Sequence, residues 1–438
     1  MFGRSSNAGH RGFLSNAALL TVAQYGAAGI GLLTTLVAAR WLGPEAFGLA
    51  AVVMAYPAAV SSFASVKTSS VTQRYASGFR ATGRPDELLA VSRLGFTVDF
   101  GASLAAVALV IGAVLVVGDL PGTGRHGELV AAFALSLPLM SFAGTGFVVL
   151  SAFGLFGMAA ALRLSEKALV LLAVVGALLI DRGAAAFVLA TAAGQAAAGL
   201  VWLLVSSAVL ARRTGRSWWT ASWASLAGLG LELRSLFGWN FIGVTLSGAM
   251  SQLPVVLLGA MRSPVEAGYF RLGSTIAVTA DYVEAAMSRV AYPLLASADA
   301  EGDVGKMVRL VRGWTRREAP LATLTVLATM ALLPVFVAVV FGDEYGSMIA
   351  GTEVLLAGVA VSAAFFFVIP YLYATGQVRT WVLSYGAYAA VALGVGTLLA
   401  PSGGFFGFAA PVGLGLAVLN LALGAAVLRQ ARRARAAP

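Results

Sequence analysis

The stretch that decides the fold is Arg40-Trp41-Leu42-Gly43-Pro44-Glu45-Ala46-Phe47-Gly48, a short turn between two long apolar segments. A similar stretch, Ser263-Pro264-Val265-Glu266-Ala267-Gly268-Tyr269, follows at an offset of 220 residues (44 to 264). Aligning the prolines also aligns Gly48 with Gly268, and the basic stretches 211–213 and 431–433 keep the same offset. A constant offset between distant positions indicates one unit of sequence used twice.

Composition places the chain in a membrane. It is 59% hydrophobic and 11% charged, with a mean hydropathy of +0.87, whereas soluble domains are about 25% charged. The apolar segments are near the ~20 residues that a helix needs to cross hydrocarbon. The net charge of +10 lies between these segments, so membrane topology explains it better than nucleic-acid binding. The absence of cysteine excludes disulfides and thiolate metal sites.

Twelve spans are predicted, and the last six reproduce the first six at the same offset. An even number of spans gives both halves the same orientation, so the fold class is an all-α polytopic membrane protein with two parallel six-helix repeats. The predicted domains are 1–210, a cytoplasmic interfacial linker over 211–234, and 235–438. The spans are 17–39, 45–66, 94–117, 127–150, 161–181, 185–210, 235–260, 266–292, 320–341, 349–374, 379–400 and 404–428.

Basic residues set the predicted sidedness, because they accumulate in cytoplasmic segments. With the N-terminus inside, all but six of the 29 Lys and Arg residues lie in inner segments. This predicts a bacterial inner-membrane protein with both termini cytoplasmic. The first span follows a polar tail without a signal-peptide pattern, so it is expected to be retained. The linker, rich in Arg and Trp, is either a helix on which the halves rock or an ordinary interfacial loop. The six exceptions are Arg40, Arg125, Arg182 and Arg262 in outer segments and Arg271 and Arg289 within a span.

Four motifs in order resemble the Wzx-type polysaccharide flippases of the multidrug/oligosaccharidyl-lipid/polysaccharide exporter superfamily. The 40–48 stretch resembles the family's "R-x-LG-x-x-x-(F/Y)-G", and Leu236-Phe237-Gly238-Trp239 its "LL-x-FG-x-P". Phe341-Gly342-Asp343-Glu344-Tyr345 resembles an outer "GxEY" turn, and Tyr371-Leu372-Tyr373-Ala374-Thr375-Gly376-Gln377 the "L-x-AxG-(K/Q/R)" segment. The likeness spans nearly the whole chain.

The resemblance implies export of a polyprenyl-diphosphate-linked oligosaccharide from the inner to the outer leaflet by alternating access, for surface polysaccharide biosynthesis. Its implied partners are that substrate, membrane lipids and other polysaccharide-assembly proteins. Where many relatives carry an acidic residue in the seventh span, this chain reads Gln252-Leu253-Pro254. A role of that carboxylate therefore cannot be transferred.

Charged residues inside spans are functional candidates because burying a charge at mid-helix costs about 2.5–3.5 kcal/mol or more. Arg271 and Arg289 are five helical turns apart on one face, about 27 Å along the axis. Either both sit at opposite interfaces, or they line a cavity and hold diphosphate oxygens. Asp281 and Glu284 are expected to exchange a proton or sodium ion, with a structural ion pair as the alternative for Asp281.

The remaining candidates are polar residues of other spans. Gln24, Asn240 and Gln252 occupy the first and seventh spans, which resemble cavity-lining helices of the family. Each either contacts substrate or hydrogen-bonds between helices. Lys67 and Arg74 either receive an anionic headgroup or anchor a helix to anionic lipid. Asp99 is a third candidate for ion coupling, unless it reaches an interface.

Enzyme motifs are missing from the sequence. His10 and His126 lie in a tail and an outer loop, and neither a phosphate-binding P-loop nor a Gly-x-Ser-x-Gly motif occurs. We therefore predict no enzyme, no catalytic residue, no metal site and no cofactor beyond a coupling ion. Two alternatives remain, a cation-coupled multidrug exporter of the same superfamily and, from another class, a membrane-embedded glycan polymerase or ligase.

Overall fold

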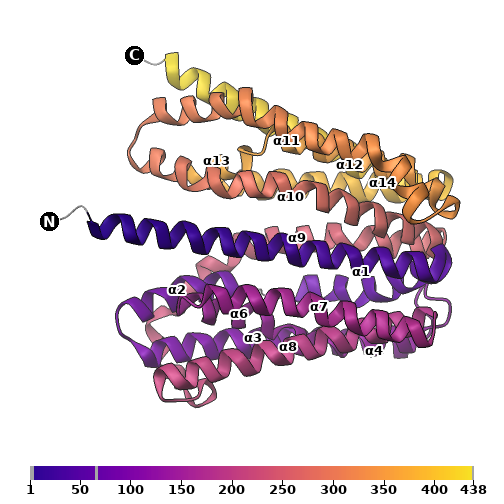
Figure 1. Ribbon diagram of the computed structural model, residues 1–438, viewed down its shortest axis with the longest axis horizontal. Coiled ribbons are helices and arrows are strands. Elements are labelled where there is room, and N and C mark those ends of the chain that lie inside the picture. The colour runs from indigo at the N-terminus through magenta and orange to yellow at the C-terminus, as the bar shows by residue number, and fades with distance from the viewer. Residues whose placement is uncertain (1–3, 65–67, 437–438) are drawn as a thin grey trace. The chain divides into compact units, whose positions relative to one another are not determined.

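The computed structural model describes the backbone of residues 4–64 and 68–436. Side chains are described there except in 4–18, 70–71, 74, 227–240 and 431–436. Within this part all regular elements are helices (Figure 1). The first half contains α1 (Arg4–Ala64), α2 (Ser69–Ala81), α3 (Pro85–Val117), α4 (Gly127–Ala134), α5 (Leu137–Met140), α6 (Phe142–Ala152), α7 (Phe156–Ile180) and α8 (Ala184–Thr214). The second contains α9 (Gly230–Met261), α10 (Pro264–Ala300), α11 (Val304–Val340), η3 (Asp343–Met348), α12 (Ile349–Ala364), α13 (Val368–Ala374) and α14 (Val378–Ala436).

Each predicted span lies on one of these helices or on a short run of them. Gly43, at φ 73°, interrupts α1 between the first two spans, and Gly404, at φ 54°, interrupts α14 between the last two. Both angles are in the region that glycine adopts without strain. The fourth span is divided into α4, α5 and α6, and the tenth into α12 and α13. The prediction of an all-α polytopic membrane fold is confirmed.

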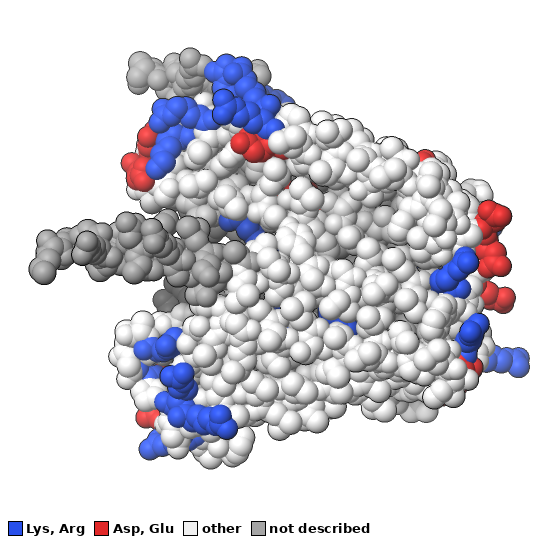
Figure 2. Space-filling view, in the orientation of Figure 1, with Lys and Arg blue, Asp and Glu red and all other residues white. Residues whose placement is uncertain are grey.

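Eight helical segments of the described residues are long and apolar enough to cross a membrane. Two of them are long enough for two predicted spans each: Leu19–Ala64 covers most of 17–39 and 45–66, and Val378–Gln430 covers 379–400 and 404–428. The fifth and eighth spans, on α7 and α10, are not among the eight, and both helices carry several charged residues. Figure 2 shows Lys, Arg, Asp and Glu gathered mainly at two opposite ends of this face, with few charged side chains between them. The two charged helices are therefore the exceptional ones.

Helix boundaries repeat as the sequence motifs do. Helix α3 begins at residue 85, and α11 begins at residue 304. Helix α8 begins at residue 184, and the kink at Gly404 marks the start of the corresponding last helical segment. In the second repeat α10 runs from Pro264 to Ala300, while the corresponding residues of the first repeat belong to the end of α1 and to α2, with 65–67 outside the described residues.

The chain forms two compact units, which are described separately. Unit 1 comprises 1–41, 53–120 and 124–245, and unit 2 comprises 42–52, 121–123 and 246–438. Unit 1 is packed around residues of α2, α3, α6 and α8, including Leu89, Phe96 and Val149. Unit 2 is packed around residues of α10 to α14, including Leu295, Val311 and Phe367.

The two repeated turns contact each other inside unit 2. A Cβ placed on Gly48 would overlap the Pro264 carbonyl. A Cβ on Gly268 would lie 2.8 Å from the Gly48 Cα and 3.4 Å from the Pro44 carbonyl oxygen. The contact is reciprocal, as in an isologous interface between identical subunits. Glycine is required at both positions because backbone atoms of one turn occupy the place of the other's side chain.

Around this contact, which we call the motif end of unit 2, three further hydrogen bonds join separate helices. The Tyr269 hydroxyl donates to the Glu344 carbonyl at 2.9 Å, and Arg262 donates to the Pro401 carbonyl at 3.0 Å. Glu266 accepts the Phe405 amide directly after the kink at Gly404. Its carboxylate thus satisfies a backbone group that the kink would otherwise leave without a helical partner.

Gly48→Ala tests the motif contact. We expect a loss of stability of about 1–3 kcal/mol or more, because overpacking against backbone is not relieved by side-chain rotation. Gly31→Ala is the matched control, since a Cβ there meets nothing within 4 Å and alanine favours a helix by up to ~1 kcal/mol. Thermal unfolding of the purified protein measures both. Equal midpoints for the two variants would contradict the requirement for glycine at 48.

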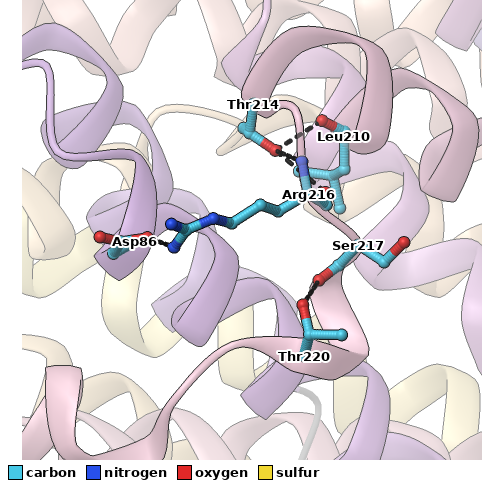
Figure 3. Close-up of polar contacts among 6 residues, drawn as sticks. All are labelled: Asp86, Leu210, Thr214, Arg216, Ser217 and Thr220. Carbon is cyan, nitrogen blue, oxygen red and sulfur yellow. Dashed lines mark hydrogen bonds and ion pairs between the residues drawn. The ribbon is translucent and has the colours of Figure 1, made fainter.

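The linker after α8 is fixed to unit 1 up to residue 226. It contains two 3₁₀ helices, η1 (Trp218–Thr220) and η2 (Trp223–Leu229). Arg216 binds Asp86 at 3.1 Å, and the Thr214 and Thr220 hydroxyls donate to the Leu210 and Ser217 carbonyls (Figure 3). Ala221 and Leu226 join the hydrophobic core of the unit. This part of the linker therefore moves with unit 1.

Arg93 of α3 holds the linker more firmly than Arg216 does. Its guanidinium donates to the Ala221 carbonyl and lies 4.7 Å from the centre of the Trp223 ring. A hydrogen bond from a charged donor contributes about 1.5–3 kcal/mol, and a cation–π contact adds about 0.5 or more. The Arg216–Asp86 pair is exposed on both sides, and such pairs contribute little.

We therefore expect Arg93→Ala to lower the thermal midpoint clearly and to increase proteolysis between 215 and 226. Arg216→Ala, the matched control, should change the midpoint little. Limited proteolysis and thermal unfolding in detergent measure these effects. If Arg216→Ala proved the more damaging change, the assignment of Arg93 as the main anchor would be wrong.

Candidate functional site

In unit 2 the candidate residues are concentrated on α10. Arg271 is partly buried, and its Nη1 donates to Oε1 of Gln252 on α9 at 3.5 Å. Its own carbonyl accepts the Thr275 hydroxyl at 2.7 Å. Among the described residues no carboxylate forms an ion pair with Arg271. A guanidinium has five donors, so most of those on Arg271 have no partner among the described residues.

Three turns further along α10, Asp281 and Glu284 form an acidic pair. Their carboxyl groups interact with each other, and Glu284 also interacts with Ser362 of α12. Glu284 is only 8% exposed, and its Oε2 has no hydrogen-bond partner among the described groups. Two negative charges this close repel strongly away from water. A proton or a cation between the carboxyl groups relieves that repulsion.

Other predicted residues lie outside this cluster or outside the described part of the chain. Arg289 is exposed on α10. The structure shows no ion pair of Asp281 with Arg271 in the described part of the chain. Lys67 and the side chains of Arg74 and Asn240 lie outside the described residues.

In unit 1 the structure adds Arg163, which the sequence analysis counted only among the basic residues that set the sidedness of the chain. Arg163 of α7 donates to Oε1 of Gln24 on α1 at 3.1 Å and lies 4.8 Å from the centre of the Phe147 ring. Glu166 is the nearest acid along the helix, yet it accepts the Trp202 indole N–H at 3.1 Å and pairs with Lys167 at 2.9 Å. Arg163 thus has neutral and aromatic partners, although a carboxylate is only one turn away. Its place within the span predicted for 161–181 was the signal available in the sequence.

Asp99 of α3 lies in a different setting. Its carboxylate accepts the Thr68 amide at 3.2 Å, the Thr68 hydroxyl at 2.9 Å and the Thr145 hydroxyl at 3.3 Å. These bonds tie α3 to the start of α2 and to α6. Asp99 is therefore connected to neighbouring helices of unit 1 and is not a lone charge at a helix end.

Solved structures with this architecture are membrane transporters. A multidrug resistance MATE family transporter of the MOP superfamily, in an inward-facing conformation, has a TM-score of 0.73 at 13% identity, covering 92% of this chain and 95% of that one. The lipid II flippase MurJ, inward closed, has a TM-score of 0.71 at 13% identity, covering 94% and 87%. An outward-facing conformation of a multidrug resistance MATE family transporter gives 0.64 at 14% identity, covering 96% of each chain.

The fold thus defines a polytopic membrane protein of the MATE and MurJ type, as the motifs indicated. Residues 37–350 match the family described as polysaccharide biosynthesis protein, and the chain belongs to that family. No protein with a curated function matches it. The resemblance to polysaccharide flippases is confirmed at the level of family and fold.

Proposed function

We propose that the protein carries a polyprenyl-diphosphate-linked oligosaccharide across the bacterial inner membrane, from the cytoplasmic to the outer leaflet, by alternating access. Both termini are cytoplasmic in this proposal, in keeping with the distribution of basic residues. The observation that carries this proposal is which partners Arg163 and Arg271 have. Each is held by the neutral amide of a glutamine, and neither has a carboxylate partner among the described residues.

A neutral partner orients an arginine without cancelling its charge. The planar guanidinium fork matches diphosphate oxygens, and charge-assisted hydrogen bonds to phosphate are about twice as strong as neutral ones. A site for organic cations would need the opposite arrangement, with acids accessible and arginines paired. Family membership in polysaccharide biosynthesis agrees with the anionic substrate.

Glutamine-to-glutamate variants test the anion site without removing an arginine. Gln252→Glu and Gln24→Glu are nearly isosteric, but each supplies a carboxylate to the arginine that it already contacts. We expect each to lower the translocation rate of a fluorescent polyprenyl-diphosphate oligosaccharide in proteoliposomes at least tenfold, about 1.4 kcal/mol. Arg163→Ala and Arg271→Ala should have similar effects.

One control lies away from both arginines, and a second removes the Gln252 amide without adding a charge. Arg213→Ala, at the exposed end of α8, should leave the rate unchanged, and Gln252→Ala should reduce it less than Gln252→Glu. Equal rates for Gln252→Glu and the unchanged protein would contradict a diphosphate contact at Arg271. Transport of organic cations in the same vesicles, without lipid translocation, would establish the multidrug alternative. Glycan transfer to an acceptor by the purified chain would establish the polymerase or ligase.

We also propose that the Asp281–Glu284 pair couples transport to a proton or sodium ion. Removing one carboxyl ends the repulsion that favours the bound ion. We therefore expect Asp281→Asn and Glu284→Gln to abolish the dependence of the translocation rate on a proton or sodium gradient. The control is Glu353→Gln, which changes an acid of α12 outside the pair. A rate that remains gradient-dependent in both variants would contradict this role.

A further inference from the structure

The first turns of α11 carry a group of basic side chains for which the proposed function has no use. Figure 2 shows Lys and Arg gathered at the end of unit 2 that contains the turn from α10 to α11. Two of the five basic residues of α11, Lys306 and Arg309, pair with acids at 2.8 and 3.6 Å. The other three are exposed and form no ion pair among the described residues. These three, which we call the arginine cluster, are Arg312, Arg316 and Arg317.

The hydrocarbon part of α11 begins directly after the arginine cluster. The stretch 320–340 is about 31 Å long at ~1.5 Å per residue, which matches the ~30 Å thickness of the hydrocarbon core. Its exposed side chains include Leu321 and Leu324, which are 61% and 60% exposed. These leucines lie four and seven residues after Arg317 and therefore share its side of the helix. A lipid whose acyl chains contact them has its phosphate at the level of Arg316 and Arg317.

The matching part of α3, in the first repeat, is covered by the linker. Counted from the first residue of each helix, Arg93 of α3 and Arg312 of α11 hold the same, ninth position. Arg93 is occupied, because it donates to the Ala221 carbonyl and lies over the Trp223 ring. Arg312 has neither an ion pair nor an aromatic ring under its guanidinium in the described part of the chain. The second repeat therefore leaves open a basic surface that the first repeat covers with protein.

The chemistry of this surface selects the kind of ligand. Guanidinium groups bind phosphate oxygens through two parallel hydrogen bonds, and basic residues beside a span attract anionic lipid headgroups. An acidic protein segment would meet the same charges. It would not account for the exposed leucines that continue the cluster into the hydrocarbon. A phospholipid matches both parts of the surface, because its phosphate and its acyl chains belong to one molecule.

We infer that the arginine cluster binds anionic phospholipid of the membrane, with the headgroups on Arg312, Arg316 and Arg317 and the acyl chains along Leu321 and Leu324. In the proposed topology this is the cytoplasmic leaflet. The bound lipid holds the start of α11, and with it the turn from α10, at the membrane surface.

This lipid site is distinct from the proposed substrate site. Arg163 and Arg271 are partly buried, and each is oriented by a glutamine. The arginines of the cluster are exposed, and no glutamine amide holds them among the described residues. An open surface of this kind suits exchangeable membrane lipid.

The test measures phospholipid binding by the purified full-length protein, without substrate. Thermal unfolding is followed in neutral detergent as phosphatidylglycerol is added, with phosphatidylcholine in parallel. We expect a saturable rise of the midpoint with phosphatidylglycerol, weaker at high salt, and a smaller rise with phosphatidylcholine. The variant Arg312→Gln/Arg316→Gln/Arg317→Gln should keep the lipid-free midpoint, because these side chains are exposed. It should need at least about fivefold more phosphatidylglycerol for half of the rise.

Two control variants separate this site from surface charge in general. Arg212→Gln/Arg213→Gln/Arg216→Gln removes three exposed charges at the end of α8 and in the linker and should keep the full response. Replacing each arginine of the cluster with lysine keeps the charge and should keep most of the response.

Equal losses in the two glutamine variants, or no rise in the unchanged protein, would overturn the site. So would a rise with poly-glutamate and none with phosphatidylglycerol, which would indicate an acidic protein as the partner. Because no transport is measured, failure here leaves the flippase proposal intact, and failure of translocation leaves this site intact.

Discussion

The contact between the two copies of the proline-containing turn is the constraint on which unit 2 depends. Gly48 and Gly268 let backbone meet backbone, and no side chain fits between them. This contact explains why residues 42–52, which belong to the first repeat, pack with the second. The hydrogen bonds of Glu266, Arg262 and Tyr269 then attach α14 and η3 to the same place. The two copies of the duplicated turn thus form a self-complementary contact.

Each unit also contains a partly buried arginine whose partner is a neutral glutamine. In unit 1 the carboxylate nearest to Arg163 along α7 is occupied by Trp202 and Lys167, and a glutamine takes its place. In unit 2 Gln252 has the corresponding role for Arg271. Burying a charge without a counter-charge is costly, so such an arrangement lowers the stability of the protein while no ligand is bound. Functional sites are where this kind of cost is expected.

The fold was predictable because its signals are long and periodic. Apolar length predicted helices at all twelve positions, although α7 and α10 are not among the segments apolar enough to cross a membrane. The 220-residue offset predicted similar helix boundaries in both halves. The kinks at Gly43 and Gly404 and the division of the fourth and tenth spans depend on local packing, which hydropathy does not record. The site was predicted less completely. Arg271, Asp281 and Glu284 were identifiable as charges within a span, but the partners of Arg163 and the threonines around Asp99 come from distant helices. No spacing along the chain brings residues 68, 99 and 145 together.

The uninterrupted course of α10 has a mechanical consequence. Arg271 and Glu284 are 13 residues apart on one rod, about 20 Å along its axis. A stiff helix cannot shift at one end while its other end stays in place, so the anion proposed at Arg271 and the ion proposed at the acidic pair would act on the same displacement. If binding of the anion changes the affinity for the ion, binding of the ion changes the affinity for the anion by the same factor, because such linkage is reciprocal.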